Sequence, residues 1–309
     1  MWLKKLIFTA PSLIAFVIIF IFCSIISPFF FTNYNFQNIL RQIAVNGLLA
    51  IGLTMVILIG GIDLSIGSIL GLVAIISAML IRAEVGLIQI ILVAIIIGMA
   101  IGVTNGFLIT QFSIAPFVIT LGMQFVLRGL CFSITRGRTI FVEMPFNVDF
   151  IANGDIGPIP FPAVLLGLVY FIIFLVMQYT VFGRHLYAIG GNEESARLFG
   201  VNVKLVKIAV YAICGITAAI AGIMNLSRIS VGDPQAGTGI AFYIIAAVII
   251  GGNKFTGGRG GLYFTIIGLF IVTLIYNIII LMGLGYYVQL IAEGTIVIIA
   301  ALLGREGKQ

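Results

Sequence analysis

Long stretches without a charged residue follow one another along the whole chain. They cover residues 6–40, 42–62, 64–81, 85–127, 208–227 and 260–292. Each meets or exceeds the roughly 18–20 residues that a helix needs to cross a bilayer. The stretches are continuously apolar, whereas strands of a transmembrane barrel alternate apolar and polar residues over about ten positions. The pattern therefore predicts an all-α fold, a polytopic transmembrane helical bundle.

Polar and glycine-containing breaks divide these stretches into about ten expected spans. The spans cover residues 6–27, 43–59, 66–81, 87–109, 114–134, 161–181, 205–226, 240–253, 261–282 and 286–303. Because they recur from end to end, residues 1–309 are expected to form a single transmembrane domain. The eighth span is short, and a broken or re-entrant segment is tolerated only where protein or a cavity covers its backbone.

Charged residues are too scarce to make a water-soluble surface. They form 8% of the chain, against about 25% in a typical globular protein. The net charge of +6 does not indicate nucleic acid, because the basic residues are scattered between spans. With both termini cytoplasmic, ten Lys and Arg residues fall inside, and the positive-inside rule is satisfied. The five expected outside are Arg41, Arg82, Arg136, Arg138 and Arg228.

The residues that build metal or hydrolytic sites are sparse. Cys23, Cys131 and Cys214 lie in apolar segments and show no paired spacing, so the sequence indicates neither a disulfide framework nor a metal site. His185 is the single histidine of the sequence and lies in an expected loop. An intramembrane hydrolase is therefore the weakest interpretation of this chain.

Two glycine-interrupted junctions resemble one another. Residues 59–67 read IGGIDLSIG and residues 250–258 read IGGNKFTGG. Matched interruptions in two halves of a chain are typical of transporters that are built from an internal repeat. Glycine is also simply frequent in membrane helices, so the repeat is a possibility that the sequence leaves open.

Polar residues inside the spans are candidates for a translocation path. Asp63 is placed to cap the helix that follows it, as is Ser65, and freed backbone groups beside these residues could line a path for a hydroxyl-rich solute. Thr54 and Thr104 also lie within spans, and hydrogen bonds between helices explain such residues about as well. The candidate path consists of Asn46, Asp63, Ser65, Ser68 and Asn105.

Two charged residues lie deep within the expected spans. Arg128 and Glu293 would each cost about 2.5–3.5 kcal/mol at the centre of an inserted helix. They are therefore expected to face protein or water, or to face each other.

Four motifs occur in a specific order. Residues 60–71 read GGIDLSIGSILG, 182–203 read FGRHLYAIGGNEESARLFGVNV, 222–239 read GIMNLSRISVGDPQAGTG and 251–261 read GGNKFTGGRGG. In this order and spacing the chain closely resembles the ribose-type monosaccharide permeases of bacterial ABC importers. It departs from that pattern at residues 241–243, where an acidic pair is common, and at Glu293, where Lys is more usual.

The resemblance implies a set of partners and a location. Two permease subunits, expected to be two copies of one chain, span the bacterial cell membrane. A cytoplasmic ATP-binding cassette ATPase binds below and an extracytoplasmic sugar-binding protein docks above. ATP is used by the ATPase partner, and no cofactor is expected on this chain. The resemblance makes the capped helix after Asn192 the ATPase-coupling segment, with Gly191, Asn192, Glu193 and Arg197 as its candidate residues.

The residues themselves agree with a subunit that does not hydrolyse ATP. Lys254 lies in GGNKFTGG, which lacks the Gly-Lys-Ser/Thr ending of a phosphate-binding loop. An ion-coupled secondary transporter of a small polar solute is the alternative. Several buried acids would favour it, but only Asp63 and Glu293 lie near the membrane interior in the expected topology.

The expected topology places residues 135–160 outside the cell. Single cysteines introduced there, after replacement of the three native cysteines, should react with a membrane-impermeant thiol reagent in intact cells, or in spheroplasts if there is an outer membrane. Labelling that requires lysis would contradict this topology.

Overall fold

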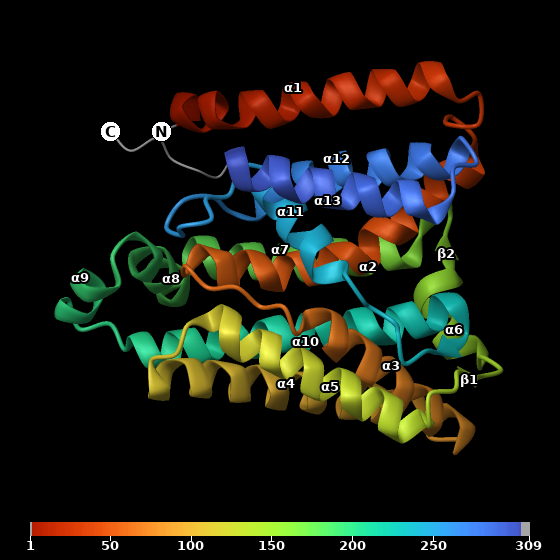
Figure 1. The fold of residues 1–309 in the computed structure, drawn as a ribbon, viewed down its shortest axis with the longest axis horizontal. Helices are drawn as coiled ribbons and strands as arrows, with labels where there is room; N and C mark the ends of the chain where they lie inside the picture. The colour runs from red at the N-terminus through yellow and green to blue at the C-terminus, as the bar shows by residue number, and fades with distance from the viewer. Residues whose placement is uncertain (1, 304–309) are drawn as a thin grey trace.

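The computed structural model describes residues 2–303 and shows a bundle of roughly parallel and antiparallel helices (Figure 1). The all-α prediction is confirmed, and ten helices match the ten expected spans in order. They are α1 (Trp2–Ile26), α2 (Asn33–Leu58), α3 (Ile66–Arg82), α4 (Leu87–Phe112), α5 (Pro116–Thr135), α7 (Phe161–Tyr179), α10 (Val203–Ile229), α11 (Ile240–Ile250), α12 (Leu262–Leu281) and α13 (Tyr286–Leu303).

The ten helices differ in their capacity to cross a membrane. Six of them, α2, α4, α5, α7, α10 and α12, are long and apolar enough. The others contain shorter apolar stretches, and α11 has 11 residues. At about 1.5 Å per residue, α11 is too short to cross a hydrocarbon core. The sequence prediction that the eighth segment is short is therefore confirmed.

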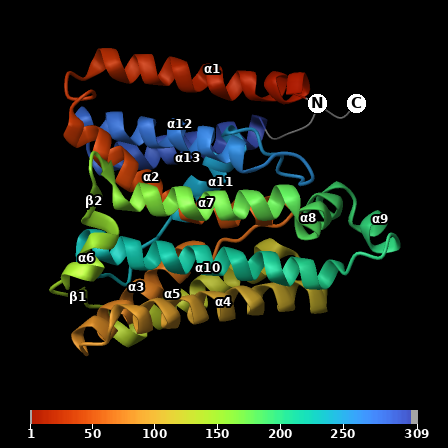
Figure 2. The same ribbon diagram turned by 180° about the vertical axis from the view of Figure 1, so that it is seen from behind.

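Helices α4 and α10 lie side by side through a stripe of glycines (Figures 1 and 2). Gly98, Gly102 and Gly106 recur every fourth residue on α4. A Cβ at Gly102 would overlap the carbonyl oxygen of Tyr211, and one at Gly98 would overlap that of Gly215. Small residues let membrane helices approach until their backbones touch, which strengthens packing where no hydrophobic effect drives association.

Two coils enter the bundle from opposite ends (Figure 1). After α2 the chain turns back through residues 59–65, and α3 begins inside the molecule. After α10, residues 233–239 run inward from the other end, and α11 begins inside. The starts of α3 and α11 meet at two glycines: a Cβ at Gly67 would overlap the carbonyl oxygen of Gly237, and a Cβ at Gly237 would overlap that of Gly67. Gly237 also has a φ of +73°, which favours glycine.

Residues 59–67 and 250–258 are similar in sequence, but the two segments occupy different places in the fold. Residues 251–261 link α11 to α12 without leading into the bundle (Figure 1). The Gly258 amide donates to the Leu58 carbonyl at 2.9 Å, so this linker lies against the end of α2. The coil that leads inward to a helix, as 59–65 does, is 233–239. A repeat built on 250–258 is therefore not what the structure shows.

Short elements gather at one end of the bundle. Strand β1 (Ile140–Phe141) pairs antiparallel with β4 (Val231–Gly232), β2 (Asp155–Ile156) pairs antiparallel with β3 (Ile159–Pro160), and α6 (Phe146–Asn153) lies beside them. Arg41 pairs with Asp155 at 2.6 Å, and Arg82 donates to the carbonyl of Phe141. The residues expected outside thus share one end with the 135–160 segment.

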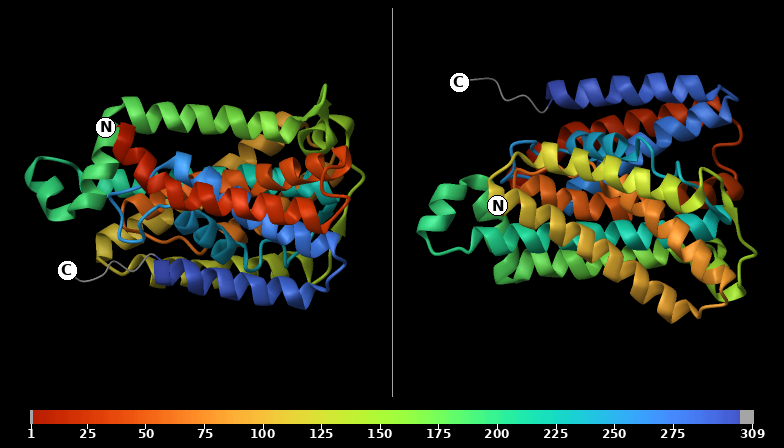
Figure 3. Two further views of the ribbon diagram at one scale, coloured as in Figure 1. Left: turned by 90° about the horizontal axis from the view of Figure 1, so that it is seen from above. Right: turned by 60° about the horizontal axis from the view of Figure 1, so that its bottom comes forward.

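The opposite end carries α8 (Val181–Gly191) and α9 (Glu193–Leu198). Figures 1 and 2 place the beginning of α1 and the end of α13 at this same end. The described chain therefore crosses the bundle an even number of times, as the charge distribution predicted. Figure 3 and Figure 1 together place α5 and α13 on one face of the bundle and α7 on the opposite face.

The glycine stripe of α4 gives a test of the fold. Gly102→Val should prevent close packing of α4 on α10 and cost about 3 kcal/mol or more through overpacking. The same substitution at Gly122 of α5 is the matched control, because nothing lies within 4 Å of its would-be Cβ. Thermal unfolding of the detergent-purified protein should shift down for Gly102→Val and stay near the parent for Gly122→Val. Equal stability of both variants would contradict this packing.

Candidate functional site

The break between α2 and α3 is a tight turn that its own side chains hold. Gly60 has a φ of +76°. Asp63 Oδ1 accepts the backbone amide of Ser65 at 2.9 Å and the Ser65 hydroxyl at 2.6 Å. Ser65 precedes the first residue of α3, but its side chain makes no capping bond. Asp63 thus closes the turn that precedes α3, and neither of the two predicted residues caps the first turn of α3 through its side chain.

Gly61 differs from Gly60, because its φ is not positive. Its constraint is space, because a Cβ there would lie 2.6 Å from the Tyr211 hydroxyl and 3.1 Å from Val56 Cγ1.

Neighbouring helices satisfy the backbone that this break frees. The carbonyl of Ile62 accepts from the Thr120 hydroxyl of α5 at 3.2 Å and from the Tyr211 hydroxyl of α10 at 3.3 Å. Asn105 of α4 donates to the Ser65 hydroxyl at 2.9 Å. Asp63 and Ser65 are fully buried, so protein covers this break, as predicted. Two buried oxygens, Asp63 Oδ2 and Asn105 Oδ1, make no hydrogen bond of normal geometry among the described residues, although the Cys214 thiol of α10 lies beside the Asp63 carboxylate.

The remaining candidate path residues lie in separate buried positions. Ser68 donates to the carbonyl of Gln124 on α5 at 3.0 Å. Asn46 of α2 lies within hydrogen-bonding reach of the Tyr243 hydroxyl, which bonds Thr273 at 2.9 Å. The structure brings Asp63, Ser65 and Asn105 into one cluster, with Ser68 on the next turn of α3, and leaves Asn46 apart. In this conformation their contacts are hydrogen bonds between helices.

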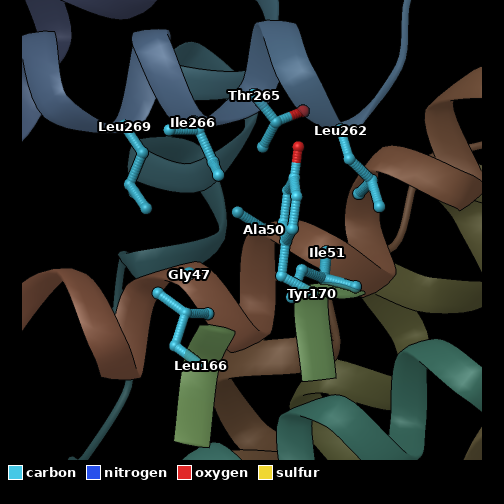
Figure 4. Close-up of a pocket in the computed structure, with 9 residues that line it drawn as sticks. All are labelled: Gly47, Ala50, Ile51, Leu166, Tyr170, Leu262, Thr265, Ile266 and Leu269. Atoms are coloured by element: carbon cyan, nitrogen blue, oxygen red, sulfur yellow. The ribbon is translucent and has the colours of Figure 1, made fainter. Parts of the chain in front are cut away.

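A small cavity adjoins α2, α7 and α12 and is mostly apolar (Figure 4). The lining residues are Gly47, Ala50, Ile51, Leu166, Tyr170, Leu262, Thr265, Ile266 and Leu269. Thr265 also bonds Thr54 at 2.7 Å. With so few polar groups, this cavity does not match the many hydroxyl groups of a sugar.

Arg128 and Glu293 do not pair with each other in the described part of the chain, so that possibility was wrong. Arg128 donates from Nη1 to the carbonyls of Pro234 at 2.5 Å and Ala236 at 2.9 Å. It therefore holds the coil that leads into α11. Among the described residues, backbone carbonyls rather than an ion pair satisfy the guanidinium, and Asp233 of the same coil lies near enough to attract its charge.

The two departures from the ribose-type pattern come together in space. Glu293 of α13 lies beside the Tyr276 hydroxyl, which makes no hydrogen bond of normal geometry. The Tyr276 ring packs edge-on against the Tyr243 ring, with centroids 5.0 Å apart. The change at 241–243 and the change at 293 thus affect one locality between α11, α12 and α13.

The candidate coupling segment is a short, well-fixed helix. The Asn192 side chain accepts the Ser195 amide at 2.7 Å and caps α9, as predicted. Glu193 pairs with Lys207 of α10 at 2.6 Å and with Arg197 at 3.5 Å. Gly191 is exposed at the end of α8. The pair with Lys207 therefore ties α9 to the long helix α10, whereas the pair with Arg197 lies within α9.

Two exposed apolar side chains lie at the tip of this segment. Leu198 is 83% exposed and Phe199 is 88% exposed, outside the bundle of apolar helices (Figure 1). Beside them an open groove runs between the α4–α5 turn and α9. Residues 109–116 form one wall, and Glu193, Arg197 and residues 201–207 contribute the other. The segment therefore presents two exposed apolar side chains next to a charged groove.

Comparison with known proteins decides the family. The family model described as the permease component of the branched-chain amino acid transport system matches residues 35–303. The chain belongs to this permease family. The match begins at α2 and ends with α13, so it includes both inward coils and the α8–α9 segment.

Curated relatives of this permease are named for sugars. It is 37% identical over 303 residues to the ribose import permease protein RbsC of Escherichia coli, covering 97% of this chain and 94% of that protein. It is 39% identical over 297 residues to the ribose import permease protein RbsC of Bacillus subtilis, covering 96% and 92%. It is 34% identical to the D-allose transport system permease protein AlsC of Escherichia coli, covering 94% and 89%. No solved structure matches the chain.

Sequence reasoning missed several functional features of this permease. It did not identify Leu198 and Phe199, although two large apolar residues that end a charged helix between spans were a usable signal. It did not predict α8, which begins with a cap at Thr180 immediately after α7. It singled out Arg128 as buried but not the carbonyls of Pro234 and Ala236 as its partners, because nothing in the sequence brings α5 next to that coil.

Two variants of the break at residues 59–65 separate the effect of side-chain volume from the effect of charge. Gly61→Val should lower the amount of folded protein in the membrane, because its side chain would collide with the Tyr211 hydroxyl. Asp63→Asn retains the accepting oxygen for Ser65 and should transport nearly normally. Membrane abundance and uptake are the measurements. Abundant Asp63→Asn protein without transport would move Asp63 from closing the turn into the translocation mechanism.

Proposed function

We propose that this permease is the membrane-spanning subunit of an ATP-driven ABC importer for a small sugar, ribose or a related monosaccharide. The observation that supports it most is the near full-length similarity to permeases named for ribose import, at 37% identity over 97% of the chain. Permeases named for D-allose and L-arabinose match over almost the same length. The sugars in these names are all small neutral polyols.

The two ends of the bundle suit different partners. At the α9 end, the capped helix, its apolar tip and the neighbouring groove suit a cytoplasmic ATPase that pushes on α9 and thereby on α10. At the opposite end, α6 and the two short hairpins suit an extracytoplasmic sugar-binding protein. A second copy of the permease completes the importer. The apolar helices then span the bacterial cell membrane, with α11 reaching only part of the way, and both termini lie in the cytoplasm.

The partner ATPase binds and hydrolyses ATP, and this chain binds no nucleotide itself. The chain supplies the path, and no phosphate-binding loop occurs in its sequence. An ion-coupled secondary transporter remains the alternative, and one observation favours it: Asp63 is a fully buried acid whose Oδ2 makes no hydrogen bond of normal geometry among the described residues. The capped α9 and its exposed tip have no evident use in such a transporter.

The function is tested by sugar uptake in cells that lack their own importers for ribose. Expression of this permease with the ATPase and the binding protein of its importer should give accumulation of labelled ribose or a related monosaccharide. Accumulation should vanish when the phosphate-binding Lys of the ATPase is replaced. Uptake that persists without the ATPase but collapses with the ion gradient would favour the alternative.

The tip of α9 should carry the contact with the ATPase. Leu198→Ala together with Phe199→Ala should reduce the ATPase that copurifies by roughly tenfold or more, because buried aromatic anchors dominate interface energy. Phe171→Ala is the matched control: Phe171 is 57% exposed on α7, within the apolar bundle. Copurification at the parent level for the double variant would contradict this contact.

Replacing Glu193 removes the ion pair that fixes α9 to Lys207 of α10, and replacing Arg197 removes the pair within α9 that helps to orient the Glu193 carboxylate. These variants should retain the ATPase but lose the stimulation of ATP hydrolysis by the loaded binding protein. Normal stimulation and transport would show that α9 does not transmit the movement.

A further inference from the structure

The coil that leads into α11 presents polar groups to the outside of the bundle. The backbone amide of Gln235 donates to Asp233 Oδ1 at 2.9 Å, and the Thr238 hydroxyl donates to the backbone carbonyl of Gln235 at 2.6 Å. These bonds turn the coil on itself and leave the side chains of Gln235 and Thr238 exposed. The coil is thus irregular, polar and accessible.

This coil lies at the depth of the apolar helices. Arg128, near the middle of α5, donates to the carbonyls of Pro234 and Ala236. Gly237 touches the first turn of α3, which begins inside the molecule. Irregular backbone at membrane depth is tolerated where protein covers it or where it lines water, and not against lipid. The face that carries this coil is therefore not a lipid face.

Polar residues flank the coil on both sides. Gln124 and Arg128 are four residues apart on α5, and Gln289 and Glu293 are four residues apart on α13, so each pair shares one face of its helix. All four are partly exposed. Glu293 Oε1 would be 3.5 Å from a Cβ at Gly239, which places α13 against the end of the coil. Figure 1 shows the coil between α5 and α13 on a single face of the bundle.

The neighbouring positions of α5 show the contrast with lipid-facing surface. Phe125 is 65% exposed and Val126 is 58% exposed, directly after Gln124 in the sequence. One side of α5 is therefore apolar and exposed, as a lipid contact should be. The adjoining side turns polar where it meets the coil.

We infer that Gln124, Arg128, Gln235, Thr238, Gln289 and Glu293 form a polar strip that binds the neutral sugar in the membrane-spanning part of the path. This inference rests on the proposed function and names a site that is distinct from the candidate path of buried residues. A second copy facing the strip encloses it and keeps it from lipid.

The composition of the strip fits a neutral polyol. A sugar hydroxyl both donates and accepts, and the strip alternates Gln and Thr groups that do both with one donor-only Arg and one acceptor-only Glu. The opposite charges balance within the strip, so it has no net preference for an ion of either sign. The apolar amino acids named by the family description would leave these polar groups unpaired, which disfavours them.

Accessibility to water is the first test. In a functional variant whose three buried native cysteines are replaced, Gln235→Cys and Thr238→Cys should react with a charged, hydrophilic thiol reagent in the assembled importer. Phe125→Cys is the control at similar depth and should react at least tenfold more slowly. Transported sugar should slow the reaction at residue 235. Reaction at 235 as slow as at 125, or unaffected by sugar, would overturn the inference.

Transport kinetics are the second test. Gln235→Ala and Gln124→Ala should each raise the KM for uptake about fivefold, the loss expected for one hydrogen bond, while Val126→Ala leaves KM unchanged. Normal membrane abundance and normal basal ATPase activity exclude misassembly as the cause. An importer that transports sugar with unchanged KM in both Gln variants would refute the strip and leave the proposed function intact. A parent importer that transports no sugar would refute the proposed function instead.

Discussion

A bilayer supplies no water to the backbone, so every interruption of a spanning helix must be satisfied by the protein itself. This permease interrupts its helices twice, and the two interruptions meet at Gly67 and Gly237. The meeting is possible because neither residue has a side chain to separate the two backbones. Thr120 and Tyr211 bond the freed carbonyl of Ile62, while Arg128 holds Pro234 and Ala236. The remaining helices enclose these contacts.

Close packing elsewhere is what allows the two breaks. Gly98, Gly102 and Gly106 bring α4 against the backbone of α10, and this approach brings Asn105 of α4 and Tyr211 of α10 to the first break. Thr120 and Arg128, two helical turns apart on α5, reach one break each. The helices that pack most closely therefore also supply the polar groups that stabilise the coils. The same helix contacts thus provide both the close packing and the hydrogen bonds to the interrupted backbone.

Much of this arrangement could be predicted from the sequence. Apolar stretches placed the ten helices of the bundle, including the short α11, and the Asn192 cap placed α9, because both signals are local. The segment that packs against the start of α3 could not be predicted in this way. The similar sequence at 250–258 lies in the linker between α11 and α12, whereas the residue that contacts Gly67 is Gly237. Helix α6 and the pairing of β1 with β4 depend on contacts between distant segments such as Ser227 with Val148, which no local pattern encodes. The candidate path stays a prediction for a related reason, since buried polarity alone does not distinguish helix-to-helix bonds from a pathway.

The central claim is that two polar interruptions lie at membrane depth, the first buried in protein and the second on a face that lipid does not cover. A cryo-EM reconstruction of the importer in lipid nanodiscs would measure this most directly. The account predicts non-helical density for residues 59–65 and 233–239 at mid-depth, acyl-chain density against Phe125, and none against Gln235. Continuous helices through either segment, or ordered acyl chains against Gln235, would contradict it.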